Sequence, residues 1–411
     1  MKQKIFLMAV LLGTAPAIAE QTNELTLASI VAEVVANNPG LKAAHANWRA
    51  MQARVRQEGA WADPRIGVDV ERTGTQFADY TDTEWMVGQE IPLSGKNRRR
   101  AKAAGAEAEA ALAGAERRKL DLIRDATTAF YNLLNAQAQL EINDRNAALL
   151  RQFAEVSRIK YEAGTRMQSD VFMADAEVLK NTEARRDFEQ RLAEAQYRLN
   201  VLMNRPPTSA LGRAVVPAIP AIAYDAAEVE RHALLHRPEL RVAAQRINAA
   251  RARQDVAKRA WIPDPELRVE ARQFDGMGLG IQEYDTGIFF NFPWVNRGKY
   301  KAATEEAKQN RASAEYELAA VENETRGLVR EHLKRIETLH HHYSLFRDRV
   351  VPLARQSIES MRISYTNDKA TFLELITAQR TLQEVEAMSQ QHLTDYLIAL
   401  AELEAMTGGA K

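Results

Sequence analysis

Few residue patterns in this sequence have the types and spacing that chemistry requires. His340, His341 and His342 are consecutive, and neighbouring helical residues point about 100° apart, whereas metal ligands on one helix are three or four residues apart. We therefore interpret them as a surface patch. Met167 and Met173 are of a type that binds soft Cu(I), but we prefer packing between helices. No nucleophile–base pair, phosphate loop or metal quartet stands out, so the sequence predicts neither an enzyme nor a cofactor.

Two carboxylates in equivalent positions are the best candidates for a functional site. Asp170 and Glu374 follow two short turns, at residues 163–169 and 367–372, that separate helix-like segments. Acids at such positions either select cations in a pore or cap the helices that begin beside them. The sequence leaves both interpretations open.

Basic residues form two clusters, each directly after a proline that ends a candidate strand. We prefer a role in contacts with anionic lipid headgroups, with plain solvation of the helix starts as the alternative. Acidic and basic residues number 55 each, so the charge balance does not indicate nucleic acid as a partner. The clusters consist of Lys96, Arg98, Arg99, Arg100 and Lys102, and of Arg297, Lys299 and Lys301.

Aromatic side chains gather around the same candidate strands. Such side chains are typical of the boundary between a membrane and water. We predict an interfacial belt, with ordinary packing in a strand core as the alternative. Its members are Phe77, Tyr80, Trp85, Tyr284, Phe289 and Trp294.

The N-terminal segment predicts export. Lys2 and Lys4 precede an apolar run over residues 5–12, and Ala17-Ile18-Ala19 is typical of a cleavage site, so we expect residues 1–19 to be a signal peptide. No other stretch approaches the roughly 20 uncharged residues that a membrane helix needs, so any membrane insertion is expected to use strands. Cysteine is absent, so we expect no disulfide, no thiolate site and no N-terminal acylation.

A duplication organises all of these candidates. Asn38-Pro39-Gly40-Leu41 returns as Arg237-Pro238-Glu239-Leu240, and Gln89-Glu90-Ile91-Pro92 returns as Phe290-Asn291-Phe292-Pro293. Similar pairs recur about 200 residues apart along almost the whole chain. We therefore divide it into a first repeat at residues 20–204, a linker at 205–226 that crosses the equator of the helical region, and a second repeat at 227–411.

Each repeat predicts two strands followed by two long helices. Ile66, Val68 and Val70 alternate with polar residues, which indicates a strand with one apolar and one polar face. No proline lies between Pro92 and Pro206, and Ala, Glu, Arg, Leu and Gln dominate there, as in helices. The strands are expected at about 65–72, 83–92, 266–273 and 284–293, and the helices at about 95–162, 169–204, 297–364 and 372–407.

The apolar strand faces need a cover, and we expect no second sheet or short helix nearby to supply one. A lipid-facing exterior with a watery interior fits better. Four strands cannot close a barrel, and open edges are not tolerated in hydrocarbon. Two copies would give eight strands and three would give twelve, and the pattern alone does not choose between them.

With these features the chain resembles the TolC family of outer-membrane efflux channels. The resemblance rests on the duplicated strand-strand-helix-helix order, on the proline that ends each second strand, and on the turn from Tyr161 to Val171 followed by Ala174. Residues 89–96, followed by basic residues, look most like the cobalt-zinc-cadmium type of heavy-metal efflux components.

The resemblance implies a mainly α-helical fold with a membrane β-barrel. Three copies would form a twelve-stranded barrel in the outer membrane of a Gram-negative bacterium, continuing into a helical barrel across the periplasm. It also implies a passive exit duct, with heavy-metal cations as substrate, that works with a periplasmic adaptor and an inner-membrane transporter of the resistance-nodulation-division class. Alternatives are a duct for drugs or secreted polypeptides, and an exported coiled-coil structural or adaptor protein.

The same resemblance implies a gate at the periplasmic tip. In drug-efflux members, a tyrosine and an arginine contact acidic and polar residues of the neighbouring coil, and Tyr365, Ser169 and Asp170 match three of these positions. The arginine position falls on Ala370 and a second acid falls on Thr377, which indicates a weaker or different gate. Asp170 and Glu374 would each form a ring under threefold symmetry.

Overall fold

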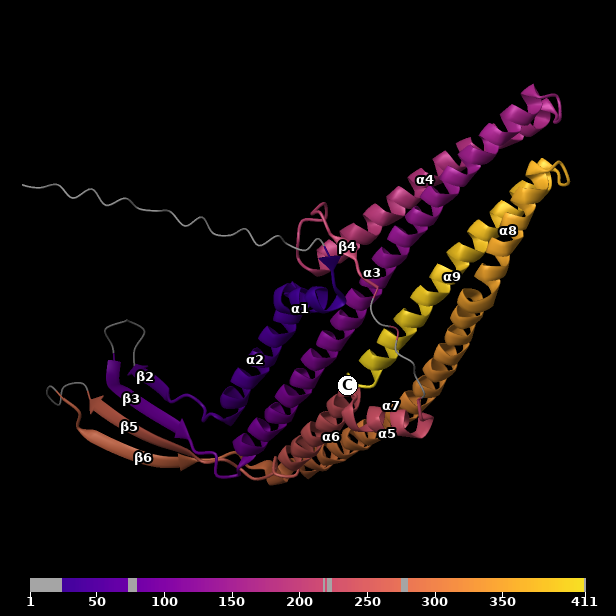
Figure 1. Cartoon of the computed structure of the whole chain (residues 1–411). Coiled ribbons are helices and arrows are strands. Elements are labelled where there is room, and N and C mark those ends of the chain that lie inside the picture. Colours follow the sequence, from indigo (N-terminus) through magenta and orange to yellow (C-terminus); the bar gives the residue numbers. More distant parts are fainter. Residues whose placement is uncertain (1–23, 73–79, 217–218, 220–223, 275–279, 410–411) are drawn as a thin grey trace, which may run out of the picture.

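The chain forms a long, bent rod with a small sheet at one end and two helix turns at the other (Figure 1). The computed structural model describes residues 24–72, 80–216, 219, 224–274 and 280–409. The expected signal peptide at residues 1–19 and Phe77 of the expected aromatic belt lie outside these residues. The described part is mainly helical with one four-stranded sheet, as the sequence predicts.

The two repeats contain closely similar series of elements. The first contains β1 (Glu24–Leu25), α1 (Leu27–Asn37), α2 (Pro39–Gly59), β2 (Arg65–Arg72), β3 (Tyr80–Glu90), α3 (Lys96–Glu162) and α4 (Gln168–Leu202). The connection contains β4 (Arg213–Ala214), which pairs in parallel with β1. The second contains α5 (Ala226–His236), α6 (Pro238–Ala257), β5 (Glu266–Phe274), β6 (Glu283–Phe289), the 3₁₀ turn η1 (Pro293–Asn296), α7 (Arg297–Leu345), the π-helical turn η2 (Phe346–Val350), α8 (Val351–Thr366) and α9 (Phe372–Met406).

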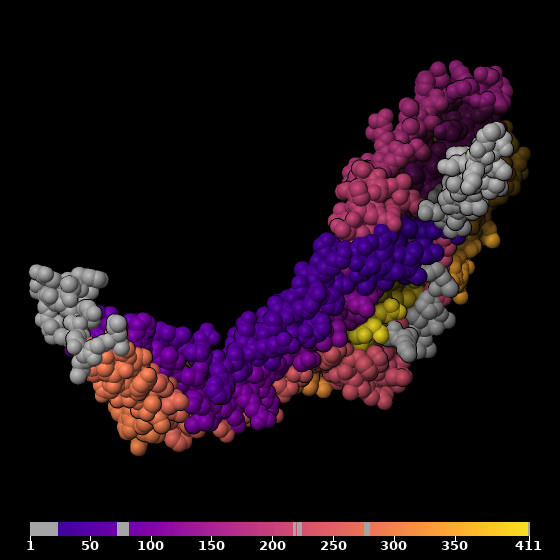
Figure 2. Space-filling view, turned by 90° about the vertical axis from the view of Figure 1, so that its left-hand side faces the viewer, coloured from indigo at the N-terminus to yellow at the C-terminus, as the bar shows by residue number. Residues whose placement is uncertain are grey.

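Two shorter helices, which the sequence did not predict, precede the strands in each repeat, but they pack against other helices and leave the apolar faces of the described strands exposed. Pro39 and Pro238 begin α2 and α6, where the missing N–H of proline costs no helical hydrogen bond. The side chain of Asn38 accepts hydrogen bonds from the N–H groups of Gly40 and Leu41. Both helices pack against α3, and Figure 2 shows α2, in indigo, along the surface of the rod.

The first long helix of the second repeat is interrupted, which the sequence did not predict. Instead of one helix over 297–364, α7 ends at Leu345, the π-helical turn follows, and α8 begins at Val351. Pro352 lies in the first turn of α8. Because proline has no backbone N–H, it cannot donate a helical hydrogen bond to a carbonyl of the preceding turn. The equivalent α3 has no such proline and continues for 67 residues, about 100 Å at 1.5 Å per residue.

Corresponding helix ends have the same left-handed backbone in both repeats. Gly164 has a φ of 73° and Asp368 a φ of 58°, and Asn204 has a φ of 59° and Gly408 a φ of 90°. Each pair is 204 residues apart. The duplication visible in the sequence is therefore also a duplication of backbone geometry at the turns.

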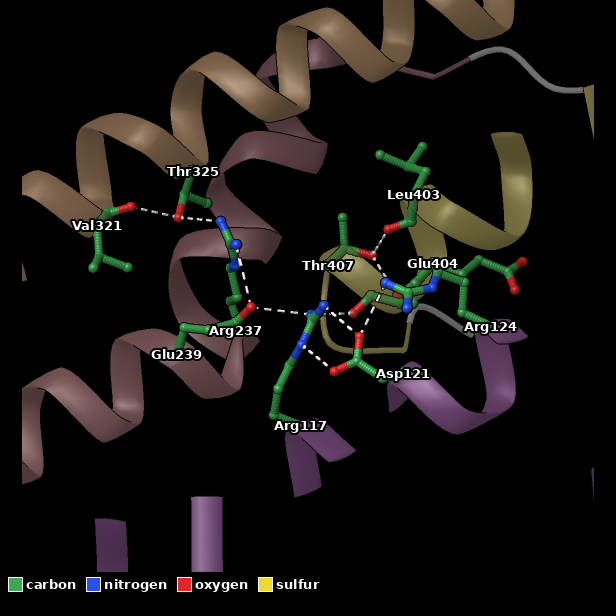
Figure 3. Close-up of polar contacts among 11 residues, drawn as sticks. Arg117, Asp121, Arg124, Arg237, Glu239, Val321, Thr325, Leu403, Glu404 and Thr407 are labelled. Carbon is green, nitrogen blue, oxygen red and sulfur yellow. Dashed lines mark hydrogen bonds and ion pairs between the residues drawn. The ribbon is translucent and has the colours of Figure 1, made fainter. Parts of the chain in front are cut away.

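A polar network joins helices from both repeats in the middle of the rod (Figure 3). Arg117 of α3 forms an ion pair with Glu239 of α6 at 3.0 Å and donates to the carbonyl of Ala405 in α9 at 3.4 Å. Arg237 donates to Glu239 at 3.2 Å and to the hydroxyl of Thr325 in α7 at 2.7 Å. The network lies beside an apolar core built around residues such as Phe130, and it holds the end of α9 against α3.

Candidate functional site

The sheet joins the two repeats and leaves two free edges. Its strands are antiparallel in the order β2-β3-β5-β6, and the central pairing places Val87 of β3 opposite Val269 of β5. Within the described residues, β2 and β6 each have a single neighbour. Unpaired backbone groups along such edges are ready to pair with another strand.

One face of this sheet is apolar and exposed. The register places Val68, Trp85, Ala271 and Tyr284 in one row across all four strands. Ile66 is the most exposed residue of this face, with 80% of its surface accessible. A continuous apolar patch of this kind marks contact with a membrane or a protein. Its large exposed members are Ile66, Val68, Val70, Trp85, Val87, Leu267, Val269, Tyr284 and Ile288.

The opposite face is strongly acidic. Arg272 forms ion pairs with Asp82 at 3.4 Å and with Glu84 at 3.0 Å, and Arg268 forms one with Glu270 at 3.6 Å. Side chains described on this face include nine carboxylates but three arginines, so it carries a net negative charge. The acids are Asp69, Glu71, Asp82, Glu84, Glu90, Glu266, Glu270, Glu283 and Asp285, and the arginines are Arg65, Arg268 and Arg272.

The residues of the expected aromatic belt divide between the two faces. Trp85 and Tyr284 lie on the apolar face, and Trp294 follows in η1, where its ring packs edge-on against Phe292. Phe289 does not belong with them, because it is paired with Glu266 and its ring lies 4.2 Å from the guanidinium carbon of Arg268 on the charged face. Of Tyr80 only the backbone, at the start of β3, is described.

The two basic clusters have different surroundings. Lys96 forms an ion pair with Asp264 at 2.9 Å, and both side chains are largely buried. Arg99 donates to the carbonyl of Gly95, and Arg100 to the side chain of Asn97. Arg98 has no ion-pair partner among the described residues. In the second cluster Arg297 and Lys299 are exposed at the start of α7.

At the far end of the rod, Glu374 caps a helix. Its carboxylate accepts hydrogen bonds from the N–H of Thr371 at 2.7 Å and from the hydroxyl of Thr371 at 2.9 Å. The N–H of Glu374 in turn donates to the hydroxyl of Thr371, which completes a capping box at the start of α9. These hydrogen bonds hold the pKa of Glu374 below its ordinary value.

The other residues expected at the gate lie nearby. Asp170 is half-buried in the first turn of α4, beside the exposed Ser169. Thr377 is exposed, and its hydroxyl donates to the carbonyl of Leu373 at 2.8 Å. Among the described residues, no hydrogen bond joins the side chains of Ser169, Asp170 and Thr377 to one another.

Tyr365 faces the interior of its own chain. Its surface is 1% exposed, and its hydroxyl lies 2.9 Å from the hydroxyl of Ser157 in α3. Burial raises the pKa of Tyr365. Its hydrogen bond thus goes to Ser157 and not to Ser169 or Asp170, because α8 packs this side chain into the apolar core at the turns.

A group of ion pairs between the two turns was not expected from the sequence. Lys160 donates to Asp368 at 2.7 Å and to the carbonyl of Thr366 at 2.9 Å. Arg166 contacts Asp368 at 3.4 Å and donates to the carbonyl of Ala370 at 2.6 Å. The hydrogen bond from Lys160 holds the pKa of Asp368 below its ordinary value. The signal in the sequence was weak, since only the 204-residue spacing aligns Gly164 with Asp368.

The histidines and methionines singled out above have ordinary surroundings. The ring of His342 lies 5.3 Å from that of His392, and the described residues contain no group of three or more potential metal ligands. Met167 is 75% exposed, so the expectation that it packs between helices is wrong for this chain. None of the described helices combines the length and apolar character needed to cross a membrane.

Comparison with known proteins identifies relatives along most of the chain. It is 25% identical over 279 residues to the toluene efflux pump outer membrane protein TtgF of Pseudomonas putida, covering 65% of this chain and 58% of that protein. It is 23% identical over 289 residues to the nickel and cobalt resistance protein CnrC of Cupriavidus metallidurans, covering 67% of this chain and 66% of that protein. The chain thus spans less than two thirds of the length of TtgF.

The fold is also found among solved structures. The outer membrane channel CmeC of Campylobacter jejuni superposes with a TM-score of 0.81 at 16% sequence identity, covering 93% of this chain and 85% of that one. The profile of the outer membrane efflux protein family matches residues 30–205 and 230–409, which are the two repeats without the linker. The chain therefore belongs to the outer membrane efflux protein family.

Proposed function

We propose that this chain is the outer-membrane subunit of an efflux system and forms, as a homotrimer, a passive exit duct for heavy-metal cations. Three four-stranded sheets would close a twelve-stranded barrel, with the apolar face toward lipid and the acidic face toward the lumen. Closure would pair the free edges of β2 and β6, which hydrocarbon does not tolerate unpaired. The helices would continue the duct into the periplasm.

The acidic face of the sheet is the observation that carries the choice of substrate. Among the described side chains, nine carboxylates against three arginines give six net negative charges per copy on the side that would line the lumen. Such a lining concentrates cations and repels anions. A neutral solvent molecule gains nothing from it, so the lining favours metal cations, such as the nickel and cobalt in the name of CnrC, over the toluene in the name of TtgF.

The duct needs partners that supply energy and substrate. We assign these roles to a periplasmic adaptor and to an inner-membrane transporter of the resistance-nodulation-division class. The adaptor would meet the turns between α3 and α4 and between α8 and α9, which are the elements farthest from the sheet (Figure 1). The chain itself would contribute no catalysis.

Residues at the two ends have assigned roles in this proposal. Asp170 would line the periplasmic constriction as a ring of three, whereas the carboxylate of Glu374 is engaged in its capping box. Trp85, Tyr284 and Trp294 would form the aromatic belt at the membrane boundary. The basic residues after β3 and β6 would lie at the inner headgroup boundary, in contact with outer-membrane lipid.

Growth of a deletion strain tests the function. The strain, with and without the gene restored, is grown on zinc, cobalt, cadmium, nickel and copper salts and on a panel of hydrophobic drugs. Sensitivity to metals alone is the expected result. Sensitivity to drugs with normal metal tolerance would support the channel function but reject heavy-metal cations as its substrate.

Bilayer conductance tests where selectivity arises. Replacing Asp69, Glu71 and Asp285 by the corresponding amides should lower the preference for cations over anions, because these acids lie on the proposed lumen face. Replacing Asp170 and Glu374 by alanine tests the tip in the same assay. Unchanged selectivity in the amide variant would reject the acidic lining as the selective element.

A further inference from the structure

We propose that two copies of this chain are joined by a repeat of the contact that links the two halves of one copy, with Arg297 of one copy ion-paired to Asp63 of the next. The inference rests on the proposed function, which places copies side by side in a membrane. Its starting point is the internal duplication, because a contact between the first and second repeat has a counterpart between the second repeat and the first repeat of another copy.

The two strand pairs correspond residue by residue. Arg65 of β2 lies opposite Gly88 of β3, and Glu266 of β5 lies opposite Phe289 of β6. A single shift of 201 residues converts the first pairing into the second. The same shift converts Lys96 into Arg297 and Asp63 into Asp264.

The contact inside one copy is well formed. Asp264 accepts a hydrogen bond from the N–H of Ser94 at 2.9 Å and forms an ion pair with Lys96 at 2.9 Å. The N–H of Ile91 donates to the carbonyl of Pro265 at 2.8 Å. The side chains of Lys96 and Asp264 are 15% and 9% exposed, so this junction excludes most water.

The corresponding groups on the free edges are exposed and form no comparable contact among the described residues. Asp63 precedes β2 and Arg297 follows β6, and neither has an ion-pair partner among the described residues. The N–H of Phe292, the counterpart of Ile91, likewise donates to no group that the structure describes. The two halves lie on opposite edges of the sheet, so a second copy must bring them together.

The same symmetry fixes the register of the new strand pairing. Inside one copy Val87 lies opposite Val269, so Ile288 of one copy should lie opposite Val68 of the next. All four residues are on the apolar face, so this register continues that face across the junction. It also places Phe290 opposite Ile66, which is 80% exposed in the single chain.

One intrachain contact has no counterpart at the junction between copies. The ion pair of Arg272 with Glu84 becomes Asp285 opposite Glu71, which brings two like charges together. The symmetry therefore predicts an attractive ion pair between Asp63 of one copy and Arg297 of the other at this junction. Loss of this ion pair should destabilise the oligomer more than loss of an ordinary surface ion pair does.

Cysteine cross-linking in the full-length, membrane-embedded chain tests the register. The chain has no cysteine of its own, so each introduced pair is read without background. The double variant Ile288→Cys with Val68→Cys should form covalent dimers and closed oligomers on oxidation. The pair Ile288→Cys with Val70→Cys, shifted by two residues on the same face, should not form these cross-linked oligomers. The pair Val87→Cys with Val269→Cys should cross-link within one chain only.

Charge exchange tests the ion pair. Arg297→Glu and Asp63→Lys should each lose the detergent-stable oligomer, and the exchanged variant Asp63→Arg with Arg297→Asp should regain it. Lys299→Glu, on the same helix, is the matched control and should keep it, because its counterpart 201 residues earlier, Arg98, forms no ion pair among the described residues. Failure of the exchange to restore the oligomer, or equal damage by Lys299→Glu, would overturn the ion pair.

The outcomes separate this inference from the proposed function. If the shifted cysteine pair cross-links instead, while the unmodified protein is oligomeric and restores metal tolerance, the register proposed here is wrong and the function stands. If the unmodified protein is a monomer in the membrane and does not restore tolerance, the proposed function fails first.

Discussion

The two turns at the far end of the rod have the same backbone and different side chains. The first has Gly164 at a φ of 73° and Met167 before α4, without a side-chain cap. The second has Asp368 at a φ of 58° and Thr371 before α9, within a capping box. Lys160 and Arg166 beside the first turn contact Asp368 of the second. The two turns thus share one backbone conformation while their side chains form complementary halves of one contact.

The largest expected effect distinguishes two equivalent tyrosines. Tyr365→Ala should destabilise the turn region by about 3–5 kcal/mol, because the side chain is buried against Phe372 and Ser157. Tyr161→Ala, 204 residues earlier and 41% exposed, should change stability by less than about 0.5 kcal/mol. Hydrogen exchange of the amides near the turns measures both. Equal effects would show that the two turns are packed alike.

The second prediction concerns the left-handed residues. Gly164→Ala should cost about 1–2 kcal/mol, because a Cβ atom at positive φ approaches the following carbonyl oxygen. Gly164→Asn should cost less, since Asn tolerates this conformation as Asp368 does in the other turn. The same exchange measurement applies. If alanine and asparagine cost the same, the backbone conformation at the first turn is not the limiting factor.

The third prediction exchanges the helix caps. Thr371→Ala removes both side-chain contacts of the capping box and should destabilise the start of α9 by about 1 kcal/mol. Met167→Thr places the same cap before α4, with Asp170 as its third helical residue, and should stabilise that start by up to about 1 kcal/mol. Loss of stability in Met167→Thr would mean that Met167 has a contact that the single chain lacks.

The smallest effect is a dependence on pH. The pKa of Asp368 is lowered in the folded chain, mainly by the hydrogen bond from Lys160, so the contact stabilises the turns at neutral pH. That contribution should be lost as pH falls below the ordinary value of 3.8 and through the lowered pKa. Hydrogen exchange near the turns, followed from pH 6 downward, measures it. Asp368→Asn should remove this component, and an unchanged profile in that variant would assign it to other acids such as Glu374.

Local sequence patterns indicated strands and long helical segments because the causes of these elements are local. The alternation of Ile66, Val68 and Val70 and the long stretch without proline each indicate one kind of structure. The helices α1, α2, α5 and α6 were missed although Pro39 and Pro238 are typical helix starts. The interruption by the π-helical turn was missed although Pro352 is visible in the sequence.

The candidate site was less predictable. Alternation placed the acids of β2 and β5 on one face, but it gave no face for Phe289, because the register of β6 is set by its pairing with β5. The hydrogen bond between Tyr365 and Ser157 joins residues 208 positions apart, and no local pattern reports it. For Glu374 the sequence left capping and cation selection open, and Thr371 three residues before it is the local signal that favours the cap.

The sequence by itself determined the duplication, the class of the fold and the presence of strands with one apolar and one charged face, because these depend on periodicity and composition. The tertiary structure decided the strand order β2-β3-β5-β6, the burial of the ion pair between Lys96 and Asp264, and the contact of Lys160 and Arg166 with Asp368. The pairing of β3 with β5 within that order, and each of the ion pairs, joins residues more than 160 positions apart. Only the folded chain brings such distant residues within the few ångströms over which hydrogen bonds and ion pairs act.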